Sequence, residues 1–542
     1  MKKRIVAAVL AILMVGSSLP MAEFASVMPD FTIAASAKEG DFENFRSKDP
    51  VKYNGMIAKY ETKQDADGVP YLSVTLTGNF FTSNKAENDI TIDTRGLKQA
   101  IADDIEEVTE GKHNINECEY FELTKSPKDS SNPKIKYLTG NENIAKVKFI
   151  DEDDFFTSLG DLFTGCKNLQ TIEFNSHINK LSSSTFSGCI NFAGSEKNNT
   201  VELVNIKEIG DSVFSGCTTL AGANLSDSLK KIGSNAFSGC TKLKKINIPA
   251  AVEYIRSSAF SGDTALTTVR FAEGSKLRYL GASAFSGCSS LTKVYAGNKE
   301  NTLPANSKLY RAGKSCFSGC TALQYFTIPK TMAYVNEGMF SSCTSLKSVS
   351  FADGSICEMI CANAFSGCSS INEMTLPDKV TAIGDYAFSE CKKLSKLIVP
   401  NNLIAFSVKI NPKWKGEKPD PEDPEKKIPI EDEDMTWEDE GMVNYSELPD
   451  NQEAWGGYKK YIRVDKYGLK ESGRTFNQCP AISIAQESKE SELKPNQIIM
   501  PNRVRYIPIG CFSKDTGITE VEMPKITDVG DYAFEYCSEL PE

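Results

Sequence analysis

A cysteine recurs at one fixed place in a short motif, and its thiol is the side chain with the most chemistry to offer in this sequence. The motif stands as "AFSGC" at 236–240, and close copies occur at 162–166, 185–189, 213–217, 284–288, 316–320 and 364–368. A repeated cysteine is compatible with a disulfide framework, a metal site, a reactive thiol or a packing position. The position of the motif within the expected secondary structure indicates which of these roles applies.

Ten of the 16 cysteines lie three residues after a recurrent phenylalanine: Cys166, Cys189, Cys217, Cys240, Cys288, Cys320, Cys343, Cys368, Cys391 and Cys537. Asp263 and Asp515 hold this slot in two other units. One position per repeat stacks into a column, and free cysteine behaves as a small, readily buried apolar group. We therefore expect buried thiols. Disulfides within the column stay open, because neighbouring turns would lie ~5 Å apart. A zinc ribbon needs C-x-x-C pairs, which the chain lacks.

Six cysteines fall outside this register: Cys118, Cys316, Cys357, Cys361, Cys479 and Cys511. Cys316 and Cys511 replace the alanine before the phenylalanine, and Cys357 replaces an inward residue, so we expect these three to be buried. Cys361 takes a turn position that glycine holds in other units. Simple tolerance in the turn is our interpretation, but Cys361 is also the candidate for an exposed, reactive thiol.

Apart from the cysteines, the sequence has few residues or motifs that could support catalysis. The only two histidines are His113 and His177, and neither lies in an H-E-x-x-H pattern. A nucleophilic pair of His177 with Cys166 or Cys189 stays open, although the register of these cysteines favours burial. No G-x-S-x-G or P-loop motif is present. We predict no enzyme activity, no cofactor, no metal site and no catalytic residue.

The spacing of the phenylalanines indicates a solenoid. From Phe163 to Phe388 they recur at steps of 23, 28, 23, 23, 25, 32, 23, 25 and 23 residues, and Phe512 and Phe534 follow 22 apart. In the unit 236–258, the pattern L-x-x-I-x-I at 243–248 alternates like a short strand facing inward, and a second extended piece follows Pro249. A unit of this length cannot bury its apolar residues alone, so the units must stack.

This pattern resembles the leucine-rich repeats of the BspA-like surface protein family, whose motif stands most fully at 236–255 and in part at 387–400. The resemblance covers about 160–400 and again about 495–542. It implies a leucine-rich-repeat solenoid with a parallel β-sheet on one face and short helical turns and irregular structure on the other. It also implies adhesion to host or matrix proteins or to other cells.

Within L-x-x-I-x-I, the intervening residues point outward and form a polar, mildly basic surface with two tyrosines. These residues are Lys244, Lys245, Asn247, Thr267, Thr268, Arg270, Thr292, Lys293, Tyr295, Gln324, Tyr325, Thr327, Lys347, Ser348 and Ser350. Tyrosine and arginine are frequent anchors of interfaces. A binding face for an extracellular or host-surface protein or glycan is our hypothesis, and an ordinary solvated sheet face is the alternative.

The domain organisation starts with an expected secretion signal peptide at 1–37. Lys2, Lys3 and Arg4 precede the apolar run 5–15, and an A-x-A site ends at Ala37; cleavage after Ala22 or Ala25 is the alternative. Residues 38–150 lack the repeat and predict an N-terminal α+β cap or small domain, with strands near 71–81 and 145–150 and a helix near 95–108. We expect repeats over 151–410.

Residues 411–450 hold 14 Asp and Glu but 5 Lys, within a formal net charge of −11 for the whole chain. Their prolines and carboxylates predict an acidic linker or insertion, with a degenerate repeat, over 411–494. Further repeats at 495–542 would end as a truncated array. Nothing global indicates a nucleic-acid partner or, after signal cleavage, a transmembrane segment.

Three function classes follow. We favour a secreted or bacterial cell-surface protein that mediates protein–protein or cell adhesion through its sheet face. A structural surface spacer or scaffold without a specific ligand is the second class. The third is the non-catalytic part of a larger secreted enzyme, or an enzyme whose catalytic module lies in 38–150 or beyond the sequence.

Overall fold

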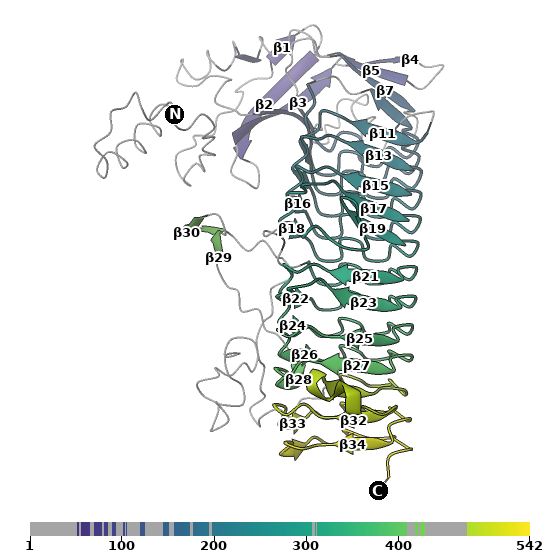
Figure 1. The fold of residues 1–542 in the computed structure, drawn as a ribbon. Coiled ribbons are helices and arrows are strands. Elements are labelled where there is room, and N and C mark those ends of the chain that lie inside the picture. Colours follow the sequence, from purple (N-terminus) through teal and green to yellow (C-terminus); the bar gives the residue numbers. More distant parts are fainter. Residues whose placement is uncertain are drawn as a thin grey trace, which may run out of the picture.

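A computed structural model describes residues 51–53, 56–64, 70–78, 81–84, 89–93, 101–102, 105, 120–124, 145–150, 157–173, 177–194, 198–305, 309, 312–408, 418–420, 423–428 and 474–541. In these residues the chain winds into coils that stack in one column, with the N-terminal strands at one end (Figure 1). The expected signal peptide, His113, Cys118 and most of the acidic run lie outside the described residues.

Each coil contributes a longer strand to a first parallel ladder. The strands of this long ladder are β9 (Thr171–Glu173), β11 (Thr200–Leu203), β13 (Gly222–Leu225), β15 (Lys245–Ile248), β17 (Thr268–Phe271), β19 (Lys293–Ala296), β21 (Tyr325–Ile328), β23 (Ser348–Phe351), β25 (Glu373–Thr375), β27 (Lys396–Val399), β31 (Ile484–Gln486), β32 (Gln497–Ile499) and β34 (Glu520–Glu522). Equivalent residues pair in register, as Ile246 does with Val269. Within each strand the inward side chain is apolar, which is the alternation that the sequence predicts.

A second parallel ladder follows the corner of each coil. The strands of this short ladder are β8 (Ser158–Leu159), β10 (Lys180–Leu181), β12 (Glu208–Ile209), β14 (Lys231–Ile232), β16 (Tyr254–Ile255), β18 (Tyr279–Leu280), β22 (Tyr334–Val335), β24 (Met359–Ile360), β26 (Ala382–Gly384), β28 (Ala405–Val408), β33 (Tyr506–Ile507) and β35 (Asp528–Val529). The solenoid therefore carries parallel sheet on two faces. The second extended piece expected after Pro249 is the short-ladder strand β16.

The motif with the repeated cysteine forms the third side of each coil as a hydrogen-bonded turn. Asn235 (φ 54°) and Gly239 (φ 75°) bracket Phe237 in the left-handed region, and other coils repeat this bracket. A right-handed helix cannot pass through such residues. The expected helical turns are therefore tight turns in the described coils. Their backbone still bonds from coil to coil, as in the 2.7 Å bond from the Phe237 N–H to the Ala259 carbonyl.

The phenylalanines form one continuous stack inside the solenoid. Thirteen rings from Phe163 to Phe534 lie parallel or nearly so, with neighbouring centroids 5.1–5.7 Å apart. Phe476 belongs to this stack, although the spacing had suggested a gap between Phe388 and Phe512. A repeat coil therefore begins near residue 474, inside the range expected to hold the linker. Within that range the described residues also form a hairpin of β29 (Lys418–Asp420) and β30 (Asp423–Ile428).

The N-terminal strands continue both ladders. β1 (Val51–Tyr53), β2 (Met56–Gln64) and β3 (Pro70–Gly78) pair antiparallel; β6 (Tyr120–Thr124) then pairs parallel with β3 and with β8. β4 (Phe81–Asn84) and β5 (Asp89–Asp93) form a hairpin, and β7 (Lys146–Ile150) joins β5 to β9. Residues 101, 102 and 105 are helical, within the expected helix. The region predicted to cap the solenoid is thus hydrogen-bonded to both of its sheets.

Candidate binding face of the solenoid

Most cysteines of the described residues form a buried column, and none of the described thiols is exposed. All fifteen cysteines of the described part are buried thiols outside any disulfide. Each thiol of the column from Cys189 onward donates to the carbonyl oxygen of a phenylalanine one coil earlier, at 3.0–3.3 Å. Burial is the largest cause that raises the pKa of these thiols, to about 12 for Cys343 and well above its usual value for Cys240.

One expectation for an individual cysteine is wrong, and one alternative is excluded. Cys479 lies in the column, because it follows Phe476 by three residues and donates to the Phe388 carbonyl at 3.0 Å. Cys361 is only 4% exposed, which excludes the alternative of a reactive surface thiol and leaves the preferred interpretation, tolerance in the turn. Cys316, Cys357 and Cys511 are buried as expected.

The two aspartates in the cysteine slot are also fully buried. Oδ1 of Asp263 accepts a hydrogen bond from the Cys240 N–H at 2.8 Å, and Oδ1 of Asp515 accepts one from the Cys479 N–H at 2.5 Å. Oδ2 of each has no hydrogen-bond partner. Burial raises the pKa of Asp515 to about 9 and that of Asp263 well above its usual value.

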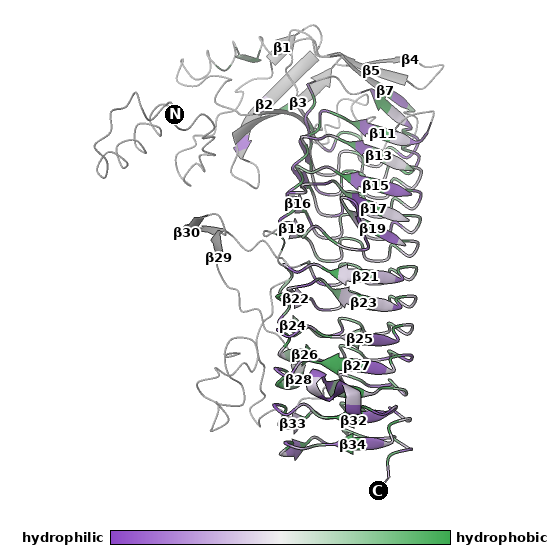
Figure 2. Cartoon of the chain, viewed as in Figure 1, coloured by the Kyte–Doolittle hydropathy of each residue, from purple (hydrophilic) through white to green (hydrophobic). Residues whose placement is uncertain are grey.

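The long ladder places the fifteen predicted face residues on its outer side. All of them are exposed or half-buried, while the residues between them, such as Ile246 and Val269, are buried. Lys245, Thr268 and Lys293 pair across β15, β17 and β19 to form one row. Asn247, Arg270 and Tyr295 form a second row. In Figure 2, hydrophilic residues lie along the strand β15, whereas the arrowhead of β27 is hydrophobic.

An ion-paired cluster organises the centre of this face. The Arg270 guanidinium lies 3.9 Å from the centroid of the Tyr295 ring, and its Nη1 donates to the Gly297 carbonyl at 3.0 Å. Glu300 accepts from the Lys293 ammonium at 2.6 Å and from the Tyr295 hydroxyl at 2.9 Å. The bond from Lys293 is the largest cause that lowers the pKa of Glu300, and the same bond raises the pKa of Lys293.

Sequence reasoning missed Glu300. It lies on β20 (Lys299–Glu300), which turns back and pairs antiparallel with β19. This hairpin belongs to the longest inserted unit of the regular array, the 32-residue step from Phe285 to Phe317. The excess length indicates an insertion, but it does not indicate that the insertion returns beside Tyr295.

Beyond the hairpin, the face continues over β21 and β23 with small hydroxyl side chains. Thr327 and Ser350 pair in register, and their hydroxyl oxygens lie 2.9 Å apart. Tyr325, on the same strand as Thr327, is 49% exposed. Lys347 donates to the Gln324 amide oxygen at 3.1 Å. This part of the face is neutral to mildly basic and already internally hydrogen-bonded.

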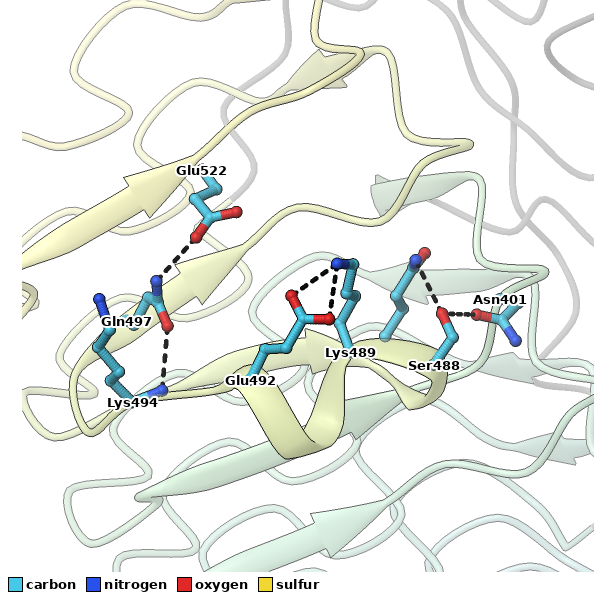
Figure 3. A network of polar contacts seen from close by, with 8 residues as sticks. Asn401, Ser488, Lys489, Glu492, Lys494, Gln497 and Glu522 are labelled. Carbon is cyan, nitrogen blue, oxygen red and sulfur yellow. Dashed lines mark hydrogen bonds and ion pairs between the residues drawn. The ribbon is translucent and has the colours of Figure 1, made fainter.

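The face ends where the 3₁₀ helix η5 (Glu487–Glu492) connects β31 to β32. Three outward residues of the ladder, Ile398, Ala485 and Ile499, are buried here and form a small apolar cluster with Leu493. Figure 3 shows the polar contacts beside this cover: Ser488 bonds Asn401, Lys489 pairs with Glu492, and Gln497 bonds Glu522. Lys396 also pairs with Glu490 at 2.6 Å. The solvated face therefore lies on the N-terminal side of β27.

Within the described residues, no group of three or more metal-ligating side chains is positioned to hold a metal ion. No helix of that same part is long and apolar enough to cross a membrane. His177 is half-buried and lies in the corner ahead of the short ladder.

The stacked coils, with L-x-x-I-x-I strands on one side and a phenylalanine stack inside, define a leucine-rich-repeat solenoid. The model of the BspA-type leucine-rich-repeat region matches residues 142–203, 190–307, 297–410 and 476–542 in six copies. These matches cover more than half of the sequence, and the chain belongs to the BspA-type leucine-rich-repeat family. Solenoids of this class are typically non-catalytic and, in this family, typically displayed on the cell surface.

Comparison with curated proteins finds no match. Among solved structures, a leucine-rich-repeat protein from Bacteroides ovatus is 24% identical, with a TM-score of 0.25, and the alignment covers 49% of this chain and 83% of that one. A leucine-rich cell-surface protein from Faecalibacterium prausnitzii is 20% identical (TM-score 0.30; 65% and 94% covered). A leucine-rich-repeat protein from Eubacterium ventriosum is 16% identical (TM-score 0.33; 69% and 98% covered).

Proposed function

We propose that this protein is exported to the bacterial cell surface and mediates adhesion by binding an extracellular or host-surface protein through the outer side of its long ladder. The observation that carries this proposal is the cluster of Arg270, Tyr295, Lys293 and Glu300 at the centre of the face. An aromatic ring held between a guanidinium and a carboxylate is fixed before any partner arrives, so little side-chain entropy remains to be lost on binding.

The composition of the face supports a protein partner. Tyr295, Tyr325 and Arg270 are of the types that dominate binding energy at protein interfaces. Lys244, Lys245 and Lys347 add positive charge around them, which favours a partner with an acidic surface. The export part of the proposal rests on the sequence of residues 1–37 and on the family.

A structural spacer without a ligand is the competing function, and the proposed absence of catalysis is common to both. Thr327 and Ser350 already hydrogen-bond to each other. This favours the function of a spacer without a ligand for the β21–β23 part of the face. The charged aromatic cluster favours binding for the β15–β19 part.

The test is a pull-down of extracellular-matrix and host-surface proteins with the full chain, compared with the variant Arg270→Ala/Tyr295→Ala. A matched control, Tyr254→Ala, removes an exposed tyrosine from the short ladder instead. We expect capture by the wild type and by the control, and loss of capture by the double variant. Equal capture by all three, or capture by none, would refute binding through this face.

A further inference from the structure

The most acidic ten-residue stretch of the sequence carries a tryptophan near its centre. Residues 431–440 read "EDEDMTWEDE", in which seven carboxylates and no lysine or arginine surround Trp437. They lie outside the described residues, between β28 and the coil that begins near residue 474. Solvated acidic segments are usually poor in aromatic residues. An indole in this run therefore favours a segment that docks on another surface over one that stays in solvent.

The centre of the long-ladder face has the opposite charge. Residues 242–248, 267–273 and 292–300 form and flank β15, β17, β19 and β20, and they contain six cations: Lys242, Lys244, Lys245, Arg270, Lys293 and Lys299. The same residues contain two carboxylates, Glu273 and Glu300, so six cations less two carboxylates leave a formal charge of +4. Residues 306–308 and 310–311, which precede β21 outside the described ranges, add two cations and no acidic residue.

Acidic side chains lie at the borders of this basic centre. On one side, Asp227 lies in the corner after β13, and Glu202 on β11 accepts hydrogen bonds of 2.7 and 2.9 Å from the Asn224 amide. On the other side, Glu373 lies on β25, beyond β21 and β23. The positive charge of the face is thus concentrated on β15 to β20.

Arg270 gives an incoming aromatic ring a place on this centre. Its half-buried guanidinium lies 3.9 Å from the centroid of the Tyr295 ring, and its Nη1 donates to the Gly297 carbonyl at 3.0 Å. The nearby carboxylate of Glu300 bonds Lys293 and the Tyr295 hydroxyl instead. A planar guanidinium stacks on aromatic faces, and tryptophan is the ring that attracts a cation most strongly.

The chain is long enough for the acidic stretch to reach the face of its own molecule. Residue 431 follows the end of β28 at Val408 by 23 residues, which span up to about 80 Å when extended. From β27, in the same coil as β28, the path to β19 crosses five strand spacings of ~4.8 Å, roughly 24 Å along the column. Half of a 23-residue coil adds at most about 40 Å around it. A tethered segment also meets its own face at a high effective concentration.

We propose that residues 431–440 dock on the centre of the long-ladder face of the same molecule. Trp437 stacks on the Arg270 guanidinium, and the flanking carboxylates pair with Lys244 and Lys245, which are exposed. The docked segment covers the surface assigned to the extracellular partner, so it is an exchangeable competitor that lowers capture of that partner. The competition, unlike the contact itself, rests on the proposed function.

The test follows Trp437 in the full chain by fluorescence. Trp414→Phe and Trp455→Phe leave it as the single tryptophan, because the sequence has three. At low ionic strength we expect blue-shifted emission and protection from the neutral quencher acrylamide. Both effects should be lost in 1 M NaCl, where the Debye length falls to about 3 Å.

Variants of the face distinguish this contact from burial of Trp437 elsewhere. Arg270→Ala/Tyr295→Ala should abolish the protection at low ionic strength. Lys244→Glu/Lys245→Glu should do the same while it leaves the stacked pair in place. Protection that survives both double variants would overturn the proposal.

Two changes at the short ladder are the matched controls. Tyr254→Ala removes an exposed tyrosine there, and Lys230→Glu reverses an exposed charge, and both should retain the protection. Dilution should also leave it unchanged. Protection that rises with protein concentration would indicate docking between molecules and would contradict docking within one.

The pull-down with extracellular-matrix and host-surface proteins then tests the competition. Replacing the seven carboxylates of 431–440 by amides should raise capture of the partner. If Trp437 is protected but no protein is captured, the contact stands and the proposed function fails. If Trp437 is as accessible in the wild-type face as in the double variants, the contact is refuted whatever the chain captures.

Discussion

The thiol of Cys240 donates a hydrogen bond across 3.2 Å to the carbonyl oxygen of Phe214 in the preceding coil. The Phe214 carbonyl also accepts the Cys217 N–H of its own turn at 3.0 Å. The same thiol bond recurs from coil to coil, so the cysteine side chain adds a hydrogen bond between neighbouring coils. A hydrogen-bonded thiol in a dry core has little tendency to ionise, and the thiolate is the reactive form of cysteine. The repeated cysteine is thus a structural element of the coil.

The described thiols should react with Ellman's reagent only after unfolding. Cys537 is the expected exception, because it is 8% exposed and its pKa, raised mainly by burial, is about 11, lower than that of Cys343 at about 12. Kinetic labelling in native and denaturing buffer, followed by peptide mapping, measures this order. Fast native labelling of Cys240 or its equivalents would contradict the buried column.

Replacing one ring of the phenylalanine stack should destabilise the solenoid strongly. Phe237 lies 5.1 Å from Phe214 and 5.2 Å from Phe260 between ring centroids and is fully buried. Phe237→Ala should lower the free energy of unfolding by about 3–5 kcal/mol. Urea denaturation checks this value, with Lys242→Ala, an exposed change in the same coil, as the control. A loss below about 1 kcal/mol would show that the stack adds little.

The buried aspartates should make the solenoid less stable as pH rises. The pKa of Asp515 is raised from 3.8 to about 9 in the folded chain, chiefly by burial. Its protonated form therefore stabilises the fold fully below about pH 4, and this contribution declines as pH rises toward 9. The decline amounts to about 1.4 kcal/mol per pH unit for one such group.

Asp515→Asn removes this titration and retains the size of the side chain. The variant should be more stable than the wild type at pH 8, and the difference should shrink as the pH falls toward 4. Urea denaturation across this range measures it, with the exposed Asp227→Asn as the control. A difference that does not change with pH would mean that Asp515 is ionised in the fold.

The cluster on the face should contribute to recognition without supporting the fold. Lys293 and Glu300 are 42% and 48% exposed, and solvent screens exposed ion pairs so that they contribute little to stability. Glu300→Ala should therefore leave the thermal midpoint nearly unchanged while it weakens capture of the partner, since Tyr295 loses the acceptor that orients its hydroxyl. A large drop in the midpoint would place the cluster among the structural contacts.

The 3₁₀ helix η5 should detach from the long ladder when the apolar cluster beneath it is made smaller. Ile499 is 4% exposed beneath this segment, so Ile499→Ala should cost about 2–4 kcal/mol and expose the 487–493 segment to proteases. Limited proteolysis with mass spectrometry detects the cut, with Met523→Ala, an exposed change, as the reference. An uncut segment in Ile499→Ala would show that the surrounding polar contacts suffice.

The repeat makes most of the fold predictable, because each coil meets the same neighbours. The alternation at Leu243, Ile246 and Ile248 specifies an inward and an outward side, and stacking then places Lys245 above Thr268. The coil of Phe476 was missed because 88 residues separate it from Phe388, so the period could not be followed. The sequence left open whether Cys361 is exposed, because a turn residue is covered by the adjoining coil rather than by its own sequence neighbours.

The site was predictable only where it follows the repeat. The outward positions of β15 to β23 follow from the strand alternation, whereas Glu300 depends on how an insertion folds back.

The hydrogen bonds that join each motif turn to the next, such as that from Phe237 to Ala259, lie in one file along the stacking direction. A pulling force along the column should therefore break these hydrogen bonds one coil boundary at a time. A stacked coil occupies ~4.8 Å of length, whereas the same 23 residues drawn out span about 80 Å. Each coil that unfolds would thus lengthen that part of the molecule more than tenfold, so we expect the array to extend like a tether under load.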